Sequence, residues 1–169
     1  MNYPQDWPQF FTATISQWKH LLKEDRFKDI VVEALRNMVI AERIHLYGFV
    51  IMSNHMHLIW QALHGYDLNK LETSLLKFTA RKFLAQLEKE QRLEEFGINA
   101  FDRKHNFWKR DSLGIEIFTP SVFQQKLNYC HQNPVKAGLC KSPEEYHYSS
   151  ALFYETGVDC FDMLVHYMG

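Results

Sequence analysis

Cysteine, glycine and proline are all scarce in this chain of 169 residues, which contains three, seven and five of them. The cysteines are odd in number and have no CxxC spacing, which excludes a disulfide framework and a cysteine zinc site. No repeat and no Gly/Ser linker interrupts the chain. Residues 1–169 are therefore expected to form one domain, of a size that suits a single hydrophobic core.

Long apolar runs are also lacking. No run reaches the roughly 18 to 20 residues that span a bilayer, and the nearest approach, 44–63, is broken by histidines and other polar residues. The N-terminus has neither the basic start nor the apolar block of a secretory signal. We therefore expect a cytoplasmic protein with no membrane partner.

An excess of one charge is lacking as well, since 19 Lys and Arg stand against 20 Asp and Glu. The composition as a whole therefore does not indicate a nucleic-acid binder, and any affinity for DNA must come from local positive charge. Aromatic residues, at 15%, and the nine histidines are abundant instead. Most of the aromatic side chains are expected in the core.

The hydrophobic pattern predicts an α+β domain. In chain order it predicts strand 10–18, helix 25–43, strands 44–52 and 55–62, helix 68–93 and strand 115–118. Asp25 is the expected N-cap of the first helix, and Asn69 with Glu72 the expected capping box of the second. The order β-α-β-β-α-β is that of a ferredoxin-like sandwich.

A further helix is predicted over 120–133, as a C-terminal addition to this sandwich. Thr119 is a good N-cap and Pro120 suits the first helical position. Pro134 is expected to end the helix at Asn133, because the residue before a proline avoids the helical conformation.

The third predicted strand contains a His-x-His pattern. Alternate residues of a strand point to one face, so His55 and His57 project together while Met56 points away. Two adjacent imidazoles can hold a divalent metal. Alone, this tripeptide is more typical of histidines on a half-exposed strand face. The strand around it is very apolar, however, so two polar rings on it need a reason.

Tyr129 and Asn133 are four residues apart on the predicted helix and therefore share a face, which Lys126 continues. A tyrosine hydroxyl can attack phosphorus when a metal polarises the phosphate, and an amide oxygen suits magnesium or manganese. Spacing alone also fits a surface tyrosine before an Asn-Pro helix end. With the two histidines, the set suits phosphodiester transfer through a phosphotyrosine, provided that the strand and the helix meet.

Two longer segments resemble the signatures of a transposase family. Residues 47–59 read Tyr-Gly-Phe-Val-Ile-Met-Ser-Asn-His-Met-His-Leu-Ile, and residues 129–139 read Tyr-Cys-His-Gln-Asn-Pro-Val-Lys-Ala-Gly-Leu. They are similar to the two signatures of single-tyrosine HUH transposases, in the branch associated with repetitive extragenic palindromes (REP) and related to the insertion-sequence-200 transposases. Residues 107–110 and 148–151 are similar to weaker blocks of that branch. The resemblance covers about residues 8 to 155.

The resemblance implies a ferredoxin-like fold with the His-x-His on a central strand. It implies a divalent metal, Mg²⁺ or Mn²⁺, held by His55, His57 and Asn133. It also implies that Tyr129 is the nucleophile of a single-stranded DNA endonuclease and strand transferase, a transposase. The product would be a 5′-phosphotyrosine with a free 3′-hydroxyl, usually beside a DNA hairpin, formed without ATP by a monomer or a homodimer.

Basic and aromatic residues around these motifs are candidate DNA contacts, because cations track a phosphate backbone and aromatic rings stack on unpaired bases. These candidates are Lys126, Lys136, Arg81, Lys82, Trp108, Lys109 and Arg110. For each of them, a solvated or packing role is an equal alternative.

Two other functions stay open at this point. One is a captured, non-catalytic protein that binds DNA hairpins on the same fold. The other is a two-histidine phosphoesterase, which needs two His-x-Ser/Thr motifs. His147 and Ser149 form one such motif, but His57 stands where the second hydroxyl should be.

Overall fold

The computed structural model describes residues 7–97 and 107–168 of the chain. Its main elements are β1 (Gln9–Thr14), α1 (Asp25–Ile40), β2 (Ile44–Ile51), β3 (His55–Ala62), α2 (Leu68–Lys89), β4 (Leu113–Glu116), α3 (Pro120–Lys136) and α4 (Ala151–Thr156). The strands form one antiparallel sheet in the order β2-β3-β1-β4. The first six of these elements have the order and pairing of the expected ferredoxin-like sandwich.

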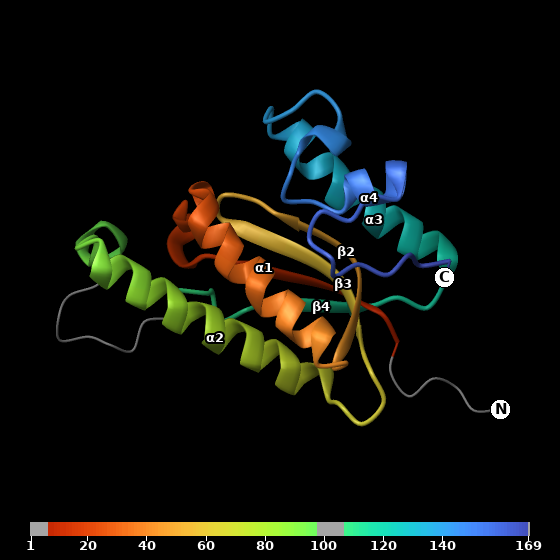
Figure 1. Ribbon diagram of the computed structural model, residues 1–169, viewed down its shortest axis with the longest axis horizontal. Coiled ribbons are helices and arrows are strands. Elements are labelled where there is room, and N and C mark those ends of the chain that lie inside the picture. Colours follow the sequence, from red (N-terminus) through yellow and green to blue (C-terminus); the bar gives the residue numbers. More distant parts are fainter. Residues whose placement is uncertain (1–6, 98–106, 169) are drawn as a thin grey trace.

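The two faces of the sheet are covered differently. Figure 1 shows α1 and α2 side by side along one face, with α3 and the C-terminal segment beyond the sheet. Along β3, Met56, Leu58 and Trp60 join the core under α1 and α2. Ile59 instead joins a smaller cluster with Phe123 of α3. The predicted alternation of β3 is therefore confirmed.

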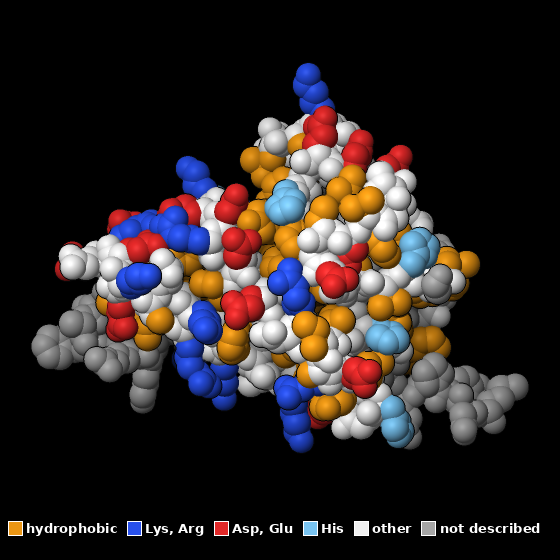
Figure 2. Space-filling model, in the orientation of Figure 1, with side chains coloured by type: hydrophobic (Ala, Val, Ile, Leu, Met, Phe, Trp, Pro, Cys, Tyr) orange, Lys and Arg blue, Asp and Glu red, His pale blue; other side chains and the backbone are white. Residues whose placement is uncertain are grey.

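The outer surface of α1 and α2 is charged with both signs, and Figure 2 shows Lys and Arg side chains intermingled with Asp and Glu there. Part of this mixture is a network of ion pairs between the start of α1 and the end of α2. In it Arg26 pairs with Glu90, and Arg92 pairs with Glu24 and Glu90. Within residues 7–97 and 107–168, no helix is long and apolar enough to cross a bilayer.

The strand predicted over 10–18 is shorter in the structure. β1 ends at Thr14, and Ser16–Trp18 forms a 3₁₀ turn in which Gln17 and Trp18 have positive φ angles of 58° and 56°. The β-forming side chains of this segment do not keep it extended, because Ser16 pairs its backbone with Phe107 rather than with the sheet. The chain therefore turns away from the sheet after Ile15.

Two helix ends, two N-caps and one strand also differ from the prediction, since α1 ends at Ile40 rather than at 43 and α2 at Lys89 rather than at 93. Glu24, not Asp25, is the N-cap of α1, although its side chain makes no capping hydrogen bond. Asp67 is the N-cap of α2, where its carboxylate accepts from the backbone N–H of Asn69 and Lys70, so the expected Asn69 capping box is wrong. β4 lies two residues earlier than 115–118, because the side chain of Ile117 is buried beside α3.

Helix α3 begins as predicted but ends later. The hydroxyl of Thr119 accepts from the N–H of Val122, which confirms the N-cap. The helix then continues past Pro134 to Lys136. The missing N–H of Pro134 removes one helical hydrogen bond, yet the following turn closes because Ala137 donates to Asn133 and Leu139 to Pro134.

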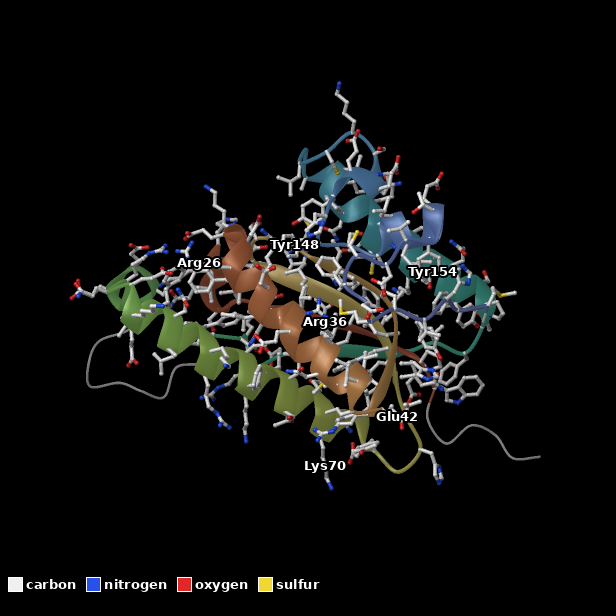
Figure 3. The ribbon with its side chains drawn as sticks, in the orientation of Figure 1. Arg26, Arg36, Glu42, Lys70, Tyr148 and Tyr154 are labelled. Atoms are coloured by element: carbon white, nitrogen blue, oxygen red, sulfur yellow. The ribbon has the colours of Figure 1, made fainter. Side chains whose placement is uncertain are left out.

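A C-terminal segment runs along the outer edge of β2. Ser150 donates its N–H to the carbonyl of Phe49, and Ile51 donates to the carbonyl of Tyr148. Figure 3 labels three side chains that tie this segment to the sandwich. Tyr148 donates to a carboxylate oxygen of Asp29, Arg36 donates to the carbonyl of Phe161, and Tyr154 donates to the carbonyl of Tyr47. This edge of the sheet is therefore covered.

Candidate active site

His55 and His57 lie on the face of β3 that α3 crosses. In the sheet they stand opposite Thr14 and Thr12 of β1, and their ring centroids are 5.0 Å apart. Met56 points into the opposite core. The His-x-His pattern therefore places two imidazoles side by side, as the period of a strand predicts.

His57 is buried with one ring nitrogen unused. Its Nδ1 shares a hydrogen bond of 2.8 Å with the hydroxyl of Thr12, while its buried Nε2 has no hydrogen-bond partner among the described residues. Burial, together with the nearby charges of His55 and Lys126, lowers its pKa to about 3. The ring is therefore neutral at neutral pH. A neutral imidazole with an unused nitrogen is what a metal ion binds.

His55 is fixed by two amides. Its Nδ1 lies 2.7 Å from the amide oxygen of Asn54, which can only accept, so this ring nitrogen donates. Burial lowers the pKa of His55, and a side-chain hydrogen bond with Asn133 acts in the opposite direction. Asn133 belongs to α3, so this influence on the pKa indicates that the helix side chain lies near the His-x-His strand.

Tyr129 projects from α3 over the same place. Its ring centroid lies 5.2 Å from that of His57 and 5.9 Å from that of Phe10, and 48% of the residue is exposed. The ammonium of Lys126, one turn earlier, lies 5.0 Å from the centre of the Phe10 ring. The strand and the helix therefore meet, and they bring together His55, His57, Tyr129, Asn133 and Lys126.

The position of α3 depends on close packing against β2. A Cβ atom at Gly48 would lie 2.8 Å from Cδ1 of Leu127, so a side chain there would require the Leu127 side chain to move. Ser150 is fully buried, and its hydroxyl accepts from the N–H of Phe49 and shares a hydrogen bond with Nε2 of His131. His131 therefore points into the fold, away from Tyr129, and burial lowers its pKa to about 4.

The residues present fit a divalent metal. Within the described parts of the chain, no three His, Cys, Asp or Glu side chains come together, so the donors here are two imidazoles and the amide of Asn133. Thr12 and Asn54 form hydrogen bonds with Nδ1 of His57 and of His55, and such bonds fix the orientation of metal-binding histidines. Thr12 and Asn54 were not predicted from the sequence. Pairing with β1 singles out Thr12 only once the register is known.

Trp108 corrects one expectation about DNA contacts. The residue is only 5% exposed, its indole donates to the hydroxyl of Thr79, and its ring packs on Phe83. This indole belongs to the core and is not a surface for stacking a base.

The other candidate DNA contacts are spread over the molecule. Lys136 is exposed at the end of α3, on the side of the site. Lys109 and Arg110 are exposed beyond the end of β1, where Lys109 donates its backbone N–H to Thr14. Arg81 and Lys82 are exposed on α2, which covers the opposite face of the sheet. The structure therefore does not bring those two residues to the histidines.

The structure does not support the phosphoesterase alternative, which needs two His-x-Ser/Thr motifs in one site. Ser149 is buried, and its hydroxyl accepts from the N–H of Ala151. The ring of His147 contacts Tyr148 and Phe161. Neither side chain joins His55 and His57.

Comparison with known proteins places the fold. No protein-family model and no curated protein matches the sequence. Among solved structures, the chain is similar to a REP-associated tyrosine transposase bound to a REP hairpin, with 19% identity, a TM-score of 0.65, and coverage of 96% of this chain and 87% of that one. It is also similar to a protein from Deinococcus radiodurans R1 that is provisionally classed as a transposase, with 15% identity, a TM-score of 0.51, and coverage of 76% and 92%. The expected fold is thus confirmed.

Proposed function

We propose that this chain is a metal-dependent transposase that nicks and rejoins single-stranded DNA next to hairpins, with Tyr129 as its nucleophile. The observation that carries the proposal is the contact between the Tyr129 ring and His57, whose buried Nε2 has no partner among the described residues. Asn133, one turn beyond Tyr129, reaches His55. The similar transposase whose solved structure contains a REP hairpin supports DNA of this kind as the substrate.

The proposed reaction exchanges one phosphodiester for another. The phenolic oxygen of Tyr129 attacks phosphorus and loses its proton, while the bond from phosphorus to the 3′-oxygen breaks and that oxygen gains a proton. The products are a 5′-phosphotyrosine and a free 3′-hydroxyl. Attack by a 3′-hydroxyl on the phosphotyrosine rejoins the strand and restores the phenol, so no ATP is needed.

Each neighbouring side chain has a task in this scheme. His55, His57 and Asn133 would hold Mg²⁺ or Mn²⁺, which supplies Lewis-acid polarisation of the phosphate when bound. Thr12 and Asn54 keep the imidazoles oriented. Phe10 packs edge-on against the Tyr129 ring and limits its motion. Lys126 places a positive charge beside the phosphate.

The test is a covalent-capture assay with labelled single-stranded hairpin oligonucleotides and Mn²⁺, resolved on a denaturing gel. Wild-type protein is expected to give a protein–DNA band that a chelator removes. Tyr129→Phe should lower the yield of this band by at least about a thousandfold and keep hairpin binding, because only the nucleophilic oxygen is lost. Tyr66→Phe is a matched control, since Tyr66 is also an exposed tyrosine and lies at the far end of β3.

A clear outcome would overturn the proposal. If a hairpin binds but neither the covalent band nor Mn²⁺ binding at His55 and His57 is found, the chain is a non-catalytic hairpin-binding protein. If Tyr129→Phe still forms the band, the nucleophile is another residue.

A further inference from the structure

Trp18 is a large aromatic residue that the fold holds at its surface. It is 57% exposed, whereas Trp60 and Trp108 are buried. It sits in the turn after β1, where Gln17 and Trp18 both have the left-handed backbone conformation. This conformation is unfavourable for residues other than glycine, so the turn places the ring in water at a cost in backbone strain.

The turn that presents Trp18 is firmly attached. Trp18 donates its N–H to Ile15, and Ser16 donates to the carbonyl of Phe107. The ammonium of Lys109 lies 5.0 Å from the centre of the indole ring. An exposed aromatic face with a cation beside it is the combination that binds unpaired nucleotides, because the ring stacks on a base and the cation attracts the phosphate.

Hydrogen bonds connect this turn to the candidate active site. Ile15 donates to the backbone carbonyl of Asn54, whose side-chain oxygen accepts from His55. His20, two residues after Trp18, shares a hydrogen bond with the hydroxyl of Ser53. The ring therefore belongs to the segment that wraps the tight turn immediately before the His-x-His strand.

We propose that Trp18, with Lys109, is a stacking platform for an unpaired base of the single-stranded DNA that reaches Tyr129. This inference rests on the proposed function for its substrate class. Stacking on an aromatic ring is tolerant of sequence, so the platform holds the strand next to the hairpin in place and leaves sequence choice to other contacts. Strain in the turn is then the cost of keeping the platform in position.

A matched pair at the other end of β3 serves as the control. Tyr66 is 41% exposed, and the guanidinium of Arg43 lies 6.0 Å from the centre of its ring. It stands in the connection between β3 and α2, away from the turn before His55. A general loss of exposed aromatic surface would therefore affect Tyr66→Ala and Trp18→Ala alike.

The experiment measures binding of a labelled oligodeoxythymidylate of about 12 nucleotides by fluorescence anisotropy, with chelator present so that no strand is cut. Trp18→Ala is expected to raise the dissociation constant by about tenfold, which is the usual effect of losing one stacked base. Trp18→Phe should keep most of the affinity, because it keeps an aromatic face. Tyr66→Ala should bind like wild type. Circular dichroism confirms that each variant is folded.

The result separates this inference from the proposed function. If Trp18→Ala binds the oligonucleotide as wild type does, the platform is wrong, even when wild type forms its Tyr129-dependent covalent band. If Trp18→Ala binds weakly but wild type forms no covalent band and binds no Mn²⁺, the platform stands as a single-strand binding site and the catalytic proposal fails.

Discussion

The two faces of the sheet differ in the side chains that they carry. Under α1 and α2, β3 contributes Met56, Leu58 and Trp60 to a continuous apolar core. Under α3 the same strand presents His55 and His57, and the nucleophile candidate above them is half exposed. One strand thus supplies apolar core residues on one side and the two candidate metal ligands on the other.

A buried nitrogen without a hydrogen-bond partner costs stability, and the described residues hold one on each side of β3, Nε1 of Trp60 in the larger core and Nε2 of His57 under α3. The Trp60 ring offsets this cost by burying a large apolar area. The His57 ring is smaller and stacks on Phe10 of the smaller cluster. Substitutions at neighbouring positions of β3 should therefore act in opposite ways.

The largest difference is expected between Leu58→Ala and His57→Leu. Leu58→Ala should lower the free energy of unfolding by about 2 to 5 kcal/mol, because it leaves a cavity in the larger core. His57→Leu should leave that free energy unchanged or raise it by about 1 kcal/mol, since it removes an unpaired buried nitrogen. Mn²⁺ binding should be lost only in His57→Leu.

Urea denaturation with chelator present gives the two free energies, and calorimetric titration with Mn²⁺ gives the binding. A loss of more than about 2 kcal/mol in His57→Leu would show that the imidazole supports the fold rather than a ligand.

Acid should lower the stability of the fold through two buried histidines on the α3 side of the sheet. In the folded chain the pKa of His57 is about 3 and that of His131 about 4, against 6.5 for an ordinary histidine. Below pH 6.5 these two histidines therefore bind protons in the unfolded chain but stay neutral in the folded chain. The free energy of unfolding falls as the pH falls. Each histidine should contribute a loss of about 2 kcal/mol between pH 7 and pH 5.

Urea midpoints of the metal-free protein at the two pH values measure this loss. His57→Leu should show a smaller pH dependence than wild type, by the share of one histidine. An unchanged dependence would mean that His57 titrates normally in the fold.

Trp108→Phe tests whether the buried indole of Trp108 acts only in the core, unlike the exposed indole of Trp18. The variant loses the hydrogen bond to Thr79 and part of the packing on Phe83. Its free energy of unfolding should fall by about 1 to 2 kcal/mol, while its affinity for the thymidylate oligonucleotide stays that of wild type. Weaker oligonucleotide binding by a folded Trp108→Phe would contradict the assignment of this ring to the core.

The smallest effect is expected for the double variant Arg81→Ala, Lys82→Ala. Both side chains lie on α2, across the sheet from His57. Hairpin binding at a fixed salt concentration should change by less than about twofold, whereas Lys126→Ala should weaken it by about fivefold. Equal losses in the two variants would show that DNA wraps both faces.

Sequence reasoning predicted which candidate site residues share a face, because the periods of a strand and of a helix decide this. His55 and His57 follow the period of a strand, and Tyr129 and Asn133 follow the period of a helix. Spacing does not predict that the strand and the helix meet, because contacts such as that of Leu127 with Gly48 appear only in the packed structure.

The errors have physical reasons of the same kind. Basic residues flank the pair Phe107 and Trp108 in the sequence, and this pattern is the same whether the Trp108 ring points inward or outward. The sequence does not predict that Trp18 is exposed, because the β-forming residues around it predict a strand over 10–18. In the structure its exposure comes from a strained turn. Pro134 was expected to end α3, but near a helix end it removes only one hydrogen bond, and its ring is buried.

The packing of α3 on the sheet of its own chain has a genetic consequence. In this chain Leu127 of α3 lies against Gly48, and Tyr129 contacts the His57 of the same chain. If the active form keeps this arrangement, a copy of the gene lacking the tyrosine and a copy lacking the histidine would not rescue each other in one cell. Rescue would show that two chains exchange the helix.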